Sequence, residues 1–194
     1  MTGLSRSALI IVDMQNDFLP GGALAVPGGD CILKAVNTLS TLGFRAVIAT
    51  QDWHPALHCS FQSQHGPWPA HCIAGTDGAA FSPLLDTRPV SHIIRKGMAP
   101  DRDSYSAFFD NDHHTSTGLD GLLLSLDINH VILCGLALDY CVSATAQDAI
   151  RTGFRTEIVP QACRGIAAFP EATLESLQRA GVGLSALLSE QKIS

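Results

Sequence analysis

The chain has 194 residues, of which 46% are hydrophobic and 15% charged, and its formal net charge is −6. This length supports a core that needs no disulfide or metal staple, so we expect a single domain over residues 1–194. The longest apolar stretch, from Val131 to Leu138, is far shorter than the roughly 18 residues of a membrane span, which excludes a membrane protein. With 12 basic against 18 acidic residues there is no basic stripe, which argues against nucleic acid as a partner.

Short runs rich in Ile and Val recur along the chain and predict buried β-strands. The runs are continuous rather than alternating, which is typical of strands that are covered on both faces. In chain order, the predicted strands are Ala8–Val12, Ala46–Thr50, His92–Arg95, Val131–Cys134, Thr156–Val159 and Val182–Leu184.

Helical spacing of apolar residues occurs between most of these strands. Strands that alternate with helices form βαβ units, so we expect an α/β fold with three αβα layers around a mainly parallel, six-stranded sheet. The long segment Gln51–Thr87 breaks the alternation and is dense in His, Pro, Gly and Trp, and loops of this length are usually functional. The predicted helices are Asp30–Leu42, Leu119–Leu126, Asp139–Arg151 and Pro170–Ala180.

The six cysteines predict free thiols rather than a disulfide framework. The chain contains no Cys-x-x-Cys pair, and its length and apolar content remove the need for cross-links. The N-terminus reaches Asp13 after a short apolar run and fits no signal peptide. We therefore expect a cytoplasmic protein, in which most cysteines are small buried hydrophobic residues.

Chemically active side chains follow four of the predicted strands. In open α/β sheets, ligands bind beyond the carboxyl ends of the strands. Each of these side chains alone has an ordinary explanation as a helix cap or a surface residue, but their coincidence at one edge predicts an active site. The first strand leads to Asp13, the second to Asp52 and His54, the third to Lys96, and the fourth to Cys141.

Cys141 is the best candidate for a nucleophile. Asp139 is a favourable N-cap residue, which would place Cys141 at the second helical position, where the helix dipole favours a thiolate. A carboxylate such as Asp13 could take the thiol proton, because a nucleophile needs an adjacent base. Lys96 between them would keep the carboxylate ionised.

Asp52 and His54 form a second candidate site. Residues two apart at the end of a strand point to the same side, so both side chains can reach one ion. His71, in the following loop, could complete the set. One oxygen and two imidazoles suit zinc, iron or manganese, with positions left open for water or substrate.

Five motifs together give the chain a specific resemblance that covers nearly its whole length. It resembles the nicotinamidase branch of the isochorismatase-like cysteine hydrolase superfamily. The first and last motifs mark the superfamily, and the middle three are more specific to the branch. The motifs are DMQNDF (13–18), QDWHP (51–55), WPAHC (68–72), DSYSAF (103–108) and DYCV (139–142).

The resemblance implies a catalytic triad of Asp13, Lys96 and Cys141. It implies hydrolysis of nicotinamide to nicotinate and ammonia through a cysteine thioester, as in NAD salvage, with pyrazinamide as a further substrate. It also implies a cis peptide between Leu136 and Ala137. This peptide would aim the backbone N–H groups of Ala137 and Cys141 into an oxyanion hole.

The same resemblance implies one divalent metal ion, zinc or iron with manganese as a further option, bound by Asp52, His54 and His71. His58 and Ser60 lie near positions that supply an additional ligand or water contact in some relatives, and the sequence does not decide between them. Core packing is the alternative explanation for the residues expected to surround the substrate ring. These wall residues are Phe18, Leu24, Trp68 and Tyr105.

Other functions stay open on the sequence. One is another amidase of the superfamily or an isochorismatase-type ether hydrolase, although the latter members generally lack the metal residues. Another is a metal-binding or redox-sensing protein in which Cys141 is reactive without turnover. Relatives include monomers and larger assemblies, so either a monomer or a homo-oligomer is expected.

Overall fold

A computed structural model describes residues 4–167 and 170–188 and contains one six-stranded sheet. The strands are β1 (Ser7–Val12), β2 (Ala46–Asp52), β3 (His92–Lys96), β4 (His130–Gly135), β5 (Arg155–Cys163) and β6 (Gly183–Leu184). Their order is β3-β2-β1-β4-β5-β6, and every neighbouring pair is parallel. The predicted six-stranded, parallel α/β fold is therefore confirmed.

The three strands β1, β2 and β4 form the centre of the core. Every residue of these strands is buried, which explains why their sequences are apolar without alternation. β5 is longer than predicted. Its register with β4 shifts before the pair Gly135–Cys163, and Pro160, which has no N–H to donate, lies in this irregular stretch.

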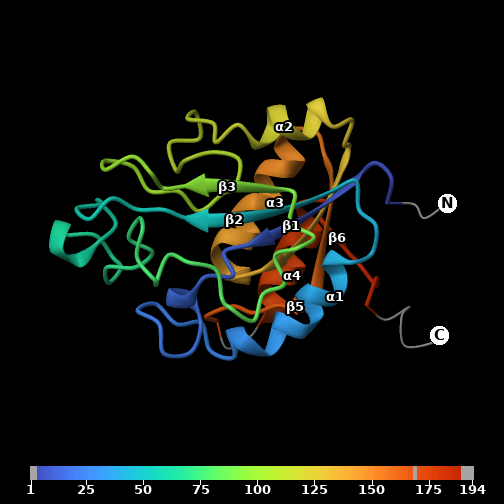
Figure 1. Ribbon diagram of the computed structural model, residues 1–194. Coiled ribbons are helices and arrows are strands. Elements are labelled where there is room, and N and C mark those ends of the chain that lie inside the picture. The colour runs from blue at the N-terminus through green and yellow to red at the C-terminus, as the bar shows by residue number, and fades with distance from the viewer. Residues whose placement is uncertain (1–3, 168–169, 189–194) are drawn as a thin grey trace.

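Helices cover both faces of the sheet, because right-handed crossovers place α1 (Leu33–Ser40) on one face and α2 (Leu119–Ser125), α3 (Ser143–Arg151) and α4 (Pro170–Arg179) on the other (Figure 1). α1 is shorter than the predicted helix: the chain first forms a 3-10 turn over Gly29–Ile32, after Gly28 in the left-handed region at φ 66°.

The long segment between β2 and β3 contains no helix or strand apart from the 3-10 turn Gln62–Gln64. Isolated bridges hold it in place, pairing His54 with Ile73 and Phe61 with Trp68. In Figure 1 the arrowheads of β1, β2 and β3 all point toward this segment. It therefore folds over the carboxyl edge of the sheet, where the chemically active residues are expected.

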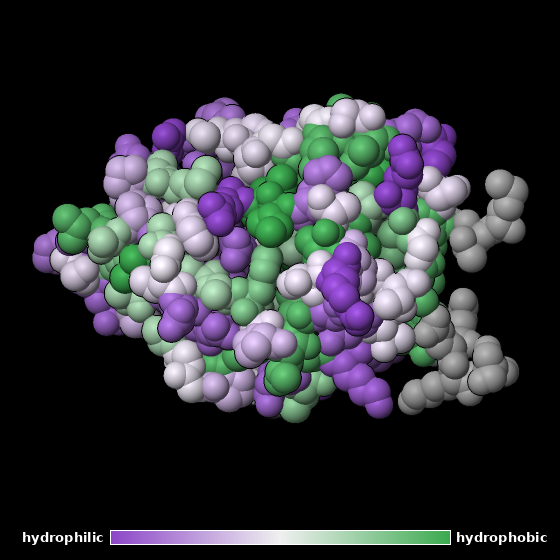
Figure 2. All heavy atoms as spheres, viewed as in Figure 1, coloured by the Kyte–Doolittle hydropathy of each residue, from purple (hydrophilic) through white to green (hydrophobic). Residues whose placement is uncertain are grey.

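The surface offers no large apolar band on the face that Figure 2 shows, where hydrophobic residues form small groups between hydrophilic ones. Large exposed apolar side chains come from separate segments, as with Leu57, Leu84 and Leu124. Scattered residues of this kind are normal on folded proteins. Among the residues described, no helix has the length and apolar content to cross a membrane.

Candidate active site

Asp13 leaves the end of β1 through a sharp turn that directs it into the interior. Its φ of 49° lies in the left-handed region, which non-glycine residues adopt rarely and mainly where surrounding structure enforces it. Thr50 of β2 enforces it here. The Asp13 N–H donates to Thr50 Oγ1 at 3.1 Å, and the Thr50 hydroxyl donates to the Asp13 carboxylate. The carboxylate is fully buried as a result.

Lys96, at the end of β3, brings two carboxylates and a thiol together. Its Nζ lies 2.9 Å from Asp13 Oδ2 and donates to Asp52 Oδ1. The same nitrogen lies 3.5 Å from Cys141 Sγ and donates to the Ser104 carbonyl at 3.1 Å. The Lys96 side chain has no exposed surface, so these contacts replace its hydration.

Burial and charge set the proton affinities in this cluster. Burial raises the pKa of Asp13, and the nearby charge of Asp52 adds to the effect, while Lys96 opposes it. Burial also raises the pKa of the Cys141 thiol, and Lys96 again works against the shift. For Asp52 the attraction to Lys96 and His54 outweighs burial and lowers the pKa. A protonated thiol thus faces a carboxylate of raised basicity, which suits proton transfer.

Cys141 lies in a π-helical turn, residues 138–142, that leads into α3. The prediction that Asp139 caps this helix is wrong, because its carboxylate instead accepts two backbone N–H groups of the segment after β5, at 3.0 and 2.6 Å. Ala137 occupies the N-cap, so Cys141 is the fourth residue of the turn and not the second. The expected lowering of the thiol pKa is also wrong, because burial raises the pKa of Cys141.

The peptide bond between Leu136 and Ala137 is cis, as the family resemblance implies. The carbonyl of Ala137 accepts the N–H groups of Tyr140 and Val142, at 3.0 and 3.1 Å. Its own N–H donates to no group within the part of the chain that the structure describes. Ala137 lines the pocket above Cys141, so this N–H is free to bind a ligand there.

Asp52, His54 and His71 direct three donor atoms to one point. Asp52 Oδ2 lies 3.6 Å from His54 Nε2 and 3.9 Å from His71 Nε2. Each imidazole bonds a backbone carbonyl through Nδ1 at 2.8 Å, that of Gly97 for His54 and that of Pro69 for His71. This arrangement turns Nε2 toward the carboxylate, as in metal-binding histidines. Among the described residues, the buried His54 Nε2 has no hydrogen-bond partner, so the donor set fits a metal ion.

His58 and Ser60 support the candidate metal ligands. The His58 ring stacks on the His54 ring with centroids 4.1 Å apart. One nitrogen of His58 bonds the Ser60 hydroxyl at 2.7 Å, and the other bonds the Arg102 carbonyl at 2.9 Å. Both ring nitrogens are therefore engaged, although His58 also lies in a potential ligand group with His54 and Asp103.

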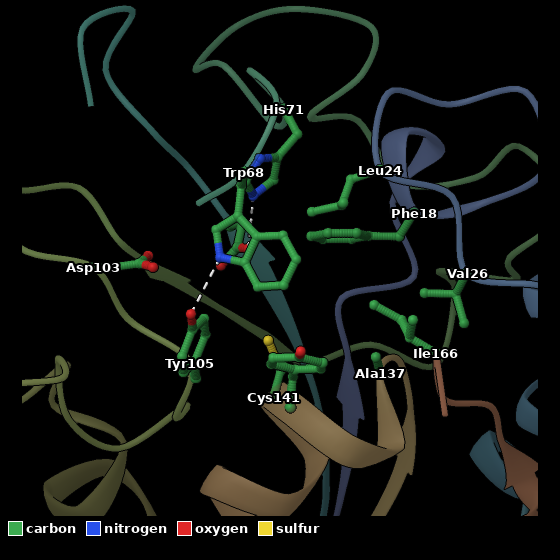
Figure 3. A pocket seen from close by; sticks show the side chains of 12 residues that line it. Phe18, Leu24, Val26, Trp68, His71, Asp103, Tyr105, Ala137, Cys141 and Ile166 are labelled. Atoms are coloured by element: carbon green, nitrogen blue, oxygen red, sulfur yellow. Dashed lines mark hydrogen bonds and ion pairs between the residues drawn. The ribbon is translucent and has the colours of Figure 1, made fainter. Parts of the chain in front are cut away.

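A pocket with aromatic walls opens above the thiol. Figure 3 shows the Cys141 sulfur at its floor, Trp68 above, Tyr105 to one side, and Phe18 with Leu24 to the other. The Trp68 indole N–H donates to the Tyr105 hydroxyl at 3.1 Å, which fixes the two rings relative to each other. The structure thus brings all four predicted wall residues to one cavity beside the predicted nucleophile.

Residues 7–186 match the isochorismatase domain. The chain belongs to this family. Nicotinamidase from Escherichia coli (strain K12) is 43% identical over 183 residues, covering 84% of this chain and 85% of that protein. The crystal structure of PnC1 from L. infantum in complex with nicotinate has a TM-score of 0.91 and 44% identity, covering 94% of this chain and 93% of that chain.

A second structural relative within the isochorismatase family contains a metal ion. Pyrazinamidase of Pyrococcus horikoshii, solved in complex with zinc, has a TM-score of 0.84 and 39% identity. The match covers 93% of this chain and 98% of that chain. The similarity therefore extends over almost the whole of both proteins.

Further residues of this isochorismatase-family pocket were not predicted from the sequence. The Tyr140 ring meets Trp68 and Tyr105 edge-on, with centroids 5.3 and 5.8 Å away, and its position directly before Cys141 is the signal that could have identified it. No sequence signal identifies Ile166. Its position depends on the hydrogen bond from its N–H to the carboxylate of Asp139, which is far away along the chain. The unpredicted lining residues are Val26, Asp103, Tyr140 and Ile166.

Proposed function

We propose that this chain is a nicotinamidase, which hydrolyses nicotinamide to nicotinate and ammonia and accepts pyrazinamide as a second substrate. The observation that carries the proposal is the buried contact of Asp13, Lys96 and Cys141 below an aromatic pocket that also contains metal-ligating side chains. A carboxamide on a planar, nitrogen-containing ring matches all three features. The similarity to a nicotinamidase and to a nicotinate complex supports this substrate class.

Asp13 and Cys141 carry out the proton transfer and the covalent step. Asp13 accepts the thiol proton as Sγ attacks the carboxamide carbon, and then gives that proton to the departing ammonia. A thioester on Cys141 remains. Asp13 next removes a proton from the water molecule that attacks the thioester, and returns this proton to Sγ as the C–S bond breaks and the nicotinate product leaves.

Lys96 stabilises negative charge during these transfers without itself exchanging a proton. Burial lowers its pKa, but the attraction to Asp13 and Asp52 is greater in sum and raises the pKa well above the ordinary value. The ammonium thus stays charged beside both Asp13 and Cys141. It favours the anionic form of whichever partner has lost the proton.

The backbone around the nucleophile supplies the proposed oxyanion hole. The uncommitted N–H of Ala137 and the N–H of Cys141 would donate to the carboxamide oxygen as it gains charge. Donors that are fixed before the reaction stabilise such an oxyanion without reorganisation.

We further propose that Asp52, His54 and His71 hold one divalent ion, for which zinc, iron and manganese are suitable. When bound, the ion supplies a Lewis-acid site for the ring nitrogen of the substrate. Phe18, Leu24, Trp68 and Tyr105 would hold the faces and edge of the ring. The chain's part is therefore to orient the ring so that the carboxamide carbon meets Sγ.

The cysteines and the sheet support proposals about the cellular compartment and the domain organisation. All six cysteines are free, which is typical of a reducing compartment, and we propose that the protein works in the cytoplasm. Since one sheet connects the described residues, we also propose that the chain acts as one domain.

Ammonia release from purified, zinc-loaded protein tests this function. Nicotinamide and pyrazinamide should be hydrolysed, whereas benzamide, which lacks the ring nitrogen, should react about 100-fold more slowly because poor placement alone costs this much. Equal rates for benzamide and nicotinamide would contradict ring placement by the metal.

A pair of cysteine variants tests the nucleophile. Cys141→Ala should release ammonia at less than about a hundredth of the wild-type rate, in line with losses seen when a catalytic group is removed. Cys163→Ala is the matched control, because Cys163 is also a buried free thiol but lies at the end of β5 outside the pocket lining. Similar activity in both variants would rule out covalent catalysis by Cys141.

A further inference from the structure

Asp17 takes no part in the reaction described above, yet its carboxylate joins two walls of the site. It lies in the 3-10 turn that follows β1. Its Oδ2 accepts the backbone N–H of Cys72 at 2.7 Å, and its Oδ1 accepts that of Ala23 at 3.3 Å. Cys72 directly follows the metal-ligating His71, and Ala23 directly precedes the pocket residue Leu24.

The contact with Cys72 fixes an unusual backbone conformation. Cys72 has a φ of 45°, in the left-handed region, and its side chain is fully buried. The charged carboxylate gives the Cys72 N–H a strong, short hydrogen bond. This N–H belongs to the peptide group that joins His71 to Cys72, so the bond sets the direction in which the His71 side chain leaves the backbone.

The hydrogen bond from His71 Nδ1 to the Pro69 carbonyl controls the other degree of freedom, the rotation of the ring. The His54 N–H also donates to the Cys72 carbonyl at 3.0 Å, so the same short segment connects two metal ligands. A shift of the peptide at Cys72 would therefore change how the imidazoles of His54 and His71 face each other.

The loop opposite is shaped to admit the carboxylate. The Asp17 N–H donates to the Gly78 carbonyl at 3.1 Å, and a Cβ atom at Gly78 would overlap the carboxylate group of Asp17. Glycine at this position leaves the space that the carboxylate needs to reach Cys72. The Asp17 carboxylate thus has space on the side of Gly78 and a hydrogen-bond donor on the side of Cys72.

We propose that Asp17 is a positioning residue for the metal site: its carboxylate fixes the peptide between His71 and Cys72 and thereby sets His71 Nε2 against Asp52. The inference rests on the metal binding proposed above. Asp17 acts through His71 and contacts neither the ion nor the substrate ring. Its loss should weaken metal binding while leaving the contacts among Asp13, Lys96 and Cys141 intact.

Zinc affinity, measured by competition with a chromophoric chelator, tests the proposal directly. Asp17→Ala should bind zinc about 10–100-fold more weakly, the usual cost of losing a partner that orients a metal ligand. Asp17→Asn keeps one carbonyl oxygen that can accept the Cys72 N–H, so its loss should be smaller. Activity of Asp17→Ala on nicotinamide should return at saturating zinc.

Two further variants separate this role from general loop packing. Asn16→Ala is the matched control, because Asn16 donates to the Asp77 carbonyl of the same loop at 2.8 Å and has no bond to Cys72; it should bind zinc as the wild type does. Gly78→Ala should displace the carboxylate and weaken zinc binding. In an Asp17→Ala background it should add little, because the colliding group is gone.

Wild-type zinc affinity in folded Asp17→Ala or Gly78→Ala would overturn the proposal, as would a loss of thermal stability with zinc affinity unchanged. If Asp17→Ala fails to fold, Gly78→Ala and Asp17→Asn decide by the same measurement. Nicotinamide hydrolysis by the wild type with Asp17-independent zinc binding would remove this inference alone. Asp17-dependent zinc binding without ammonia release would instead remove the proposed function.

Discussion

Asp13, Asp52 and Cys141 have titratable atoms within 4.8 Å of one another, and Lys96 supplies one positive charge in contact with all three. Three anions around one cation would leave the buried cluster with excess negative charge. The thiol therefore keeps its proton. The sequence places Asp52 at the same sheet edge as Cys141 but does not show that Asp52 and the thiol contact the same Lys96 ammonium. Any cation that binds Asp52 will change this balance.

The pH dependence of the alkylation rate of Cys141 should show whether a cation bound by Asp52 changes the pKa of the thiol. In metal-free protein its rise with pH should have a midpoint above the value of about 8.5 for a free cysteine, since burial and the neighbouring carboxylates raise the pKa of the thiol. Zinc should lower this midpoint, because a positive ion bound by Asp52 stabilises the nearby thiolate. Mass spectrometry of the Cys141 peptide after iodoacetamide treatment gives the profile.

The control for this experiment is His71→Ala, which removes a proposed metal ligand but no group of the Asp13–Lys96–Cys141 cluster. Its midpoint should stay the same with and without zinc. A wild-type midpoint that zinc leaves unmoved would show that the charge on Asp52 does not reach the thiol.

At the scale of elements, the close approach of β1 and β4 brings the proposed base, Asp13, and the proposed nucleophile, Cys141, close to each other. Gly135 at the end of β4 pairs with Val12 at the end of β1 and has a φ of 117°, a conformation that essentially only glycine adopts. The next N–H, that of Leu136, donates to the Val12 carbonyl at 3.0 Å. The chain after β4 thus starts against the strand that delivers Asp13.

Gly135→Ala should therefore destabilise the protein strongly, because its Cβ would overlap the Val12 backbone. Gly153→Ala is the matched control: Gly153 also has a positive φ, of 89°, but nothing lies within 4 Å of its ideal Cβ. The control should lose only the left-handed backbone cost of about 1–2 kcal/mol. Urea unfolding should show a clearly larger loss for Gly135→Ala, and equal losses would contradict the close approach.

The positions of β1, β2 and β4 followed from the sequence because strands covered on both faces need mostly apolar residues. The position of β3 was also predicted, but the expected burial was wrong there, because residues 92–95 are partly or fully exposed. The turn around Cys141 did not follow, because its shape depends on a partner far along the chain. Asp139 has the residue type of a helix cap, but its carboxylate accepts the N–H groups of Ile166 and Ala167 instead of capping the helix. Local propensity gave way to a tertiary contact there.

At the scale of the molecule, strand polarity explains why the principal site residues could be predicted together. Asp13, Lys96 and the turn of Cys141 all lie at or after the carboxyl ends of parallel strands, which must share one edge. The pocket lining from Val26 and Ile166 could not be predicted in this way, because these residues lie outside the strands and their positions depend on how the loops fold.

Metal binding should stabilise the whole fold, since it links the end of β2 to the long segment that covers the sheet edge. Zinc at 100 times its dissociation constant should raise the free energy of unfolding by about 2.7 kcal/mol, measured by urea denaturation. His71→Ala should lose most of this gain. His65→Ala, which removes an exposed histidine of the same segment, should retain it, and equal behaviour of the two variants would contradict the assigned ligand.

Asp13 and Lys96 sit at the ends of paired strands and Cys141 sits in the turn before α3, whereas Leu24, Val26 and Ile166 sit on connections between elements. The residues proposed to react are therefore carried by different segments from these three residues that shape the pocket. Loops tolerate replacement better than the sheet that carries them. Combinatorial libraries at these three positions are therefore the natural starting point for redesign toward bulkier heteroaromatic amides, with the cysteine chemistry retained.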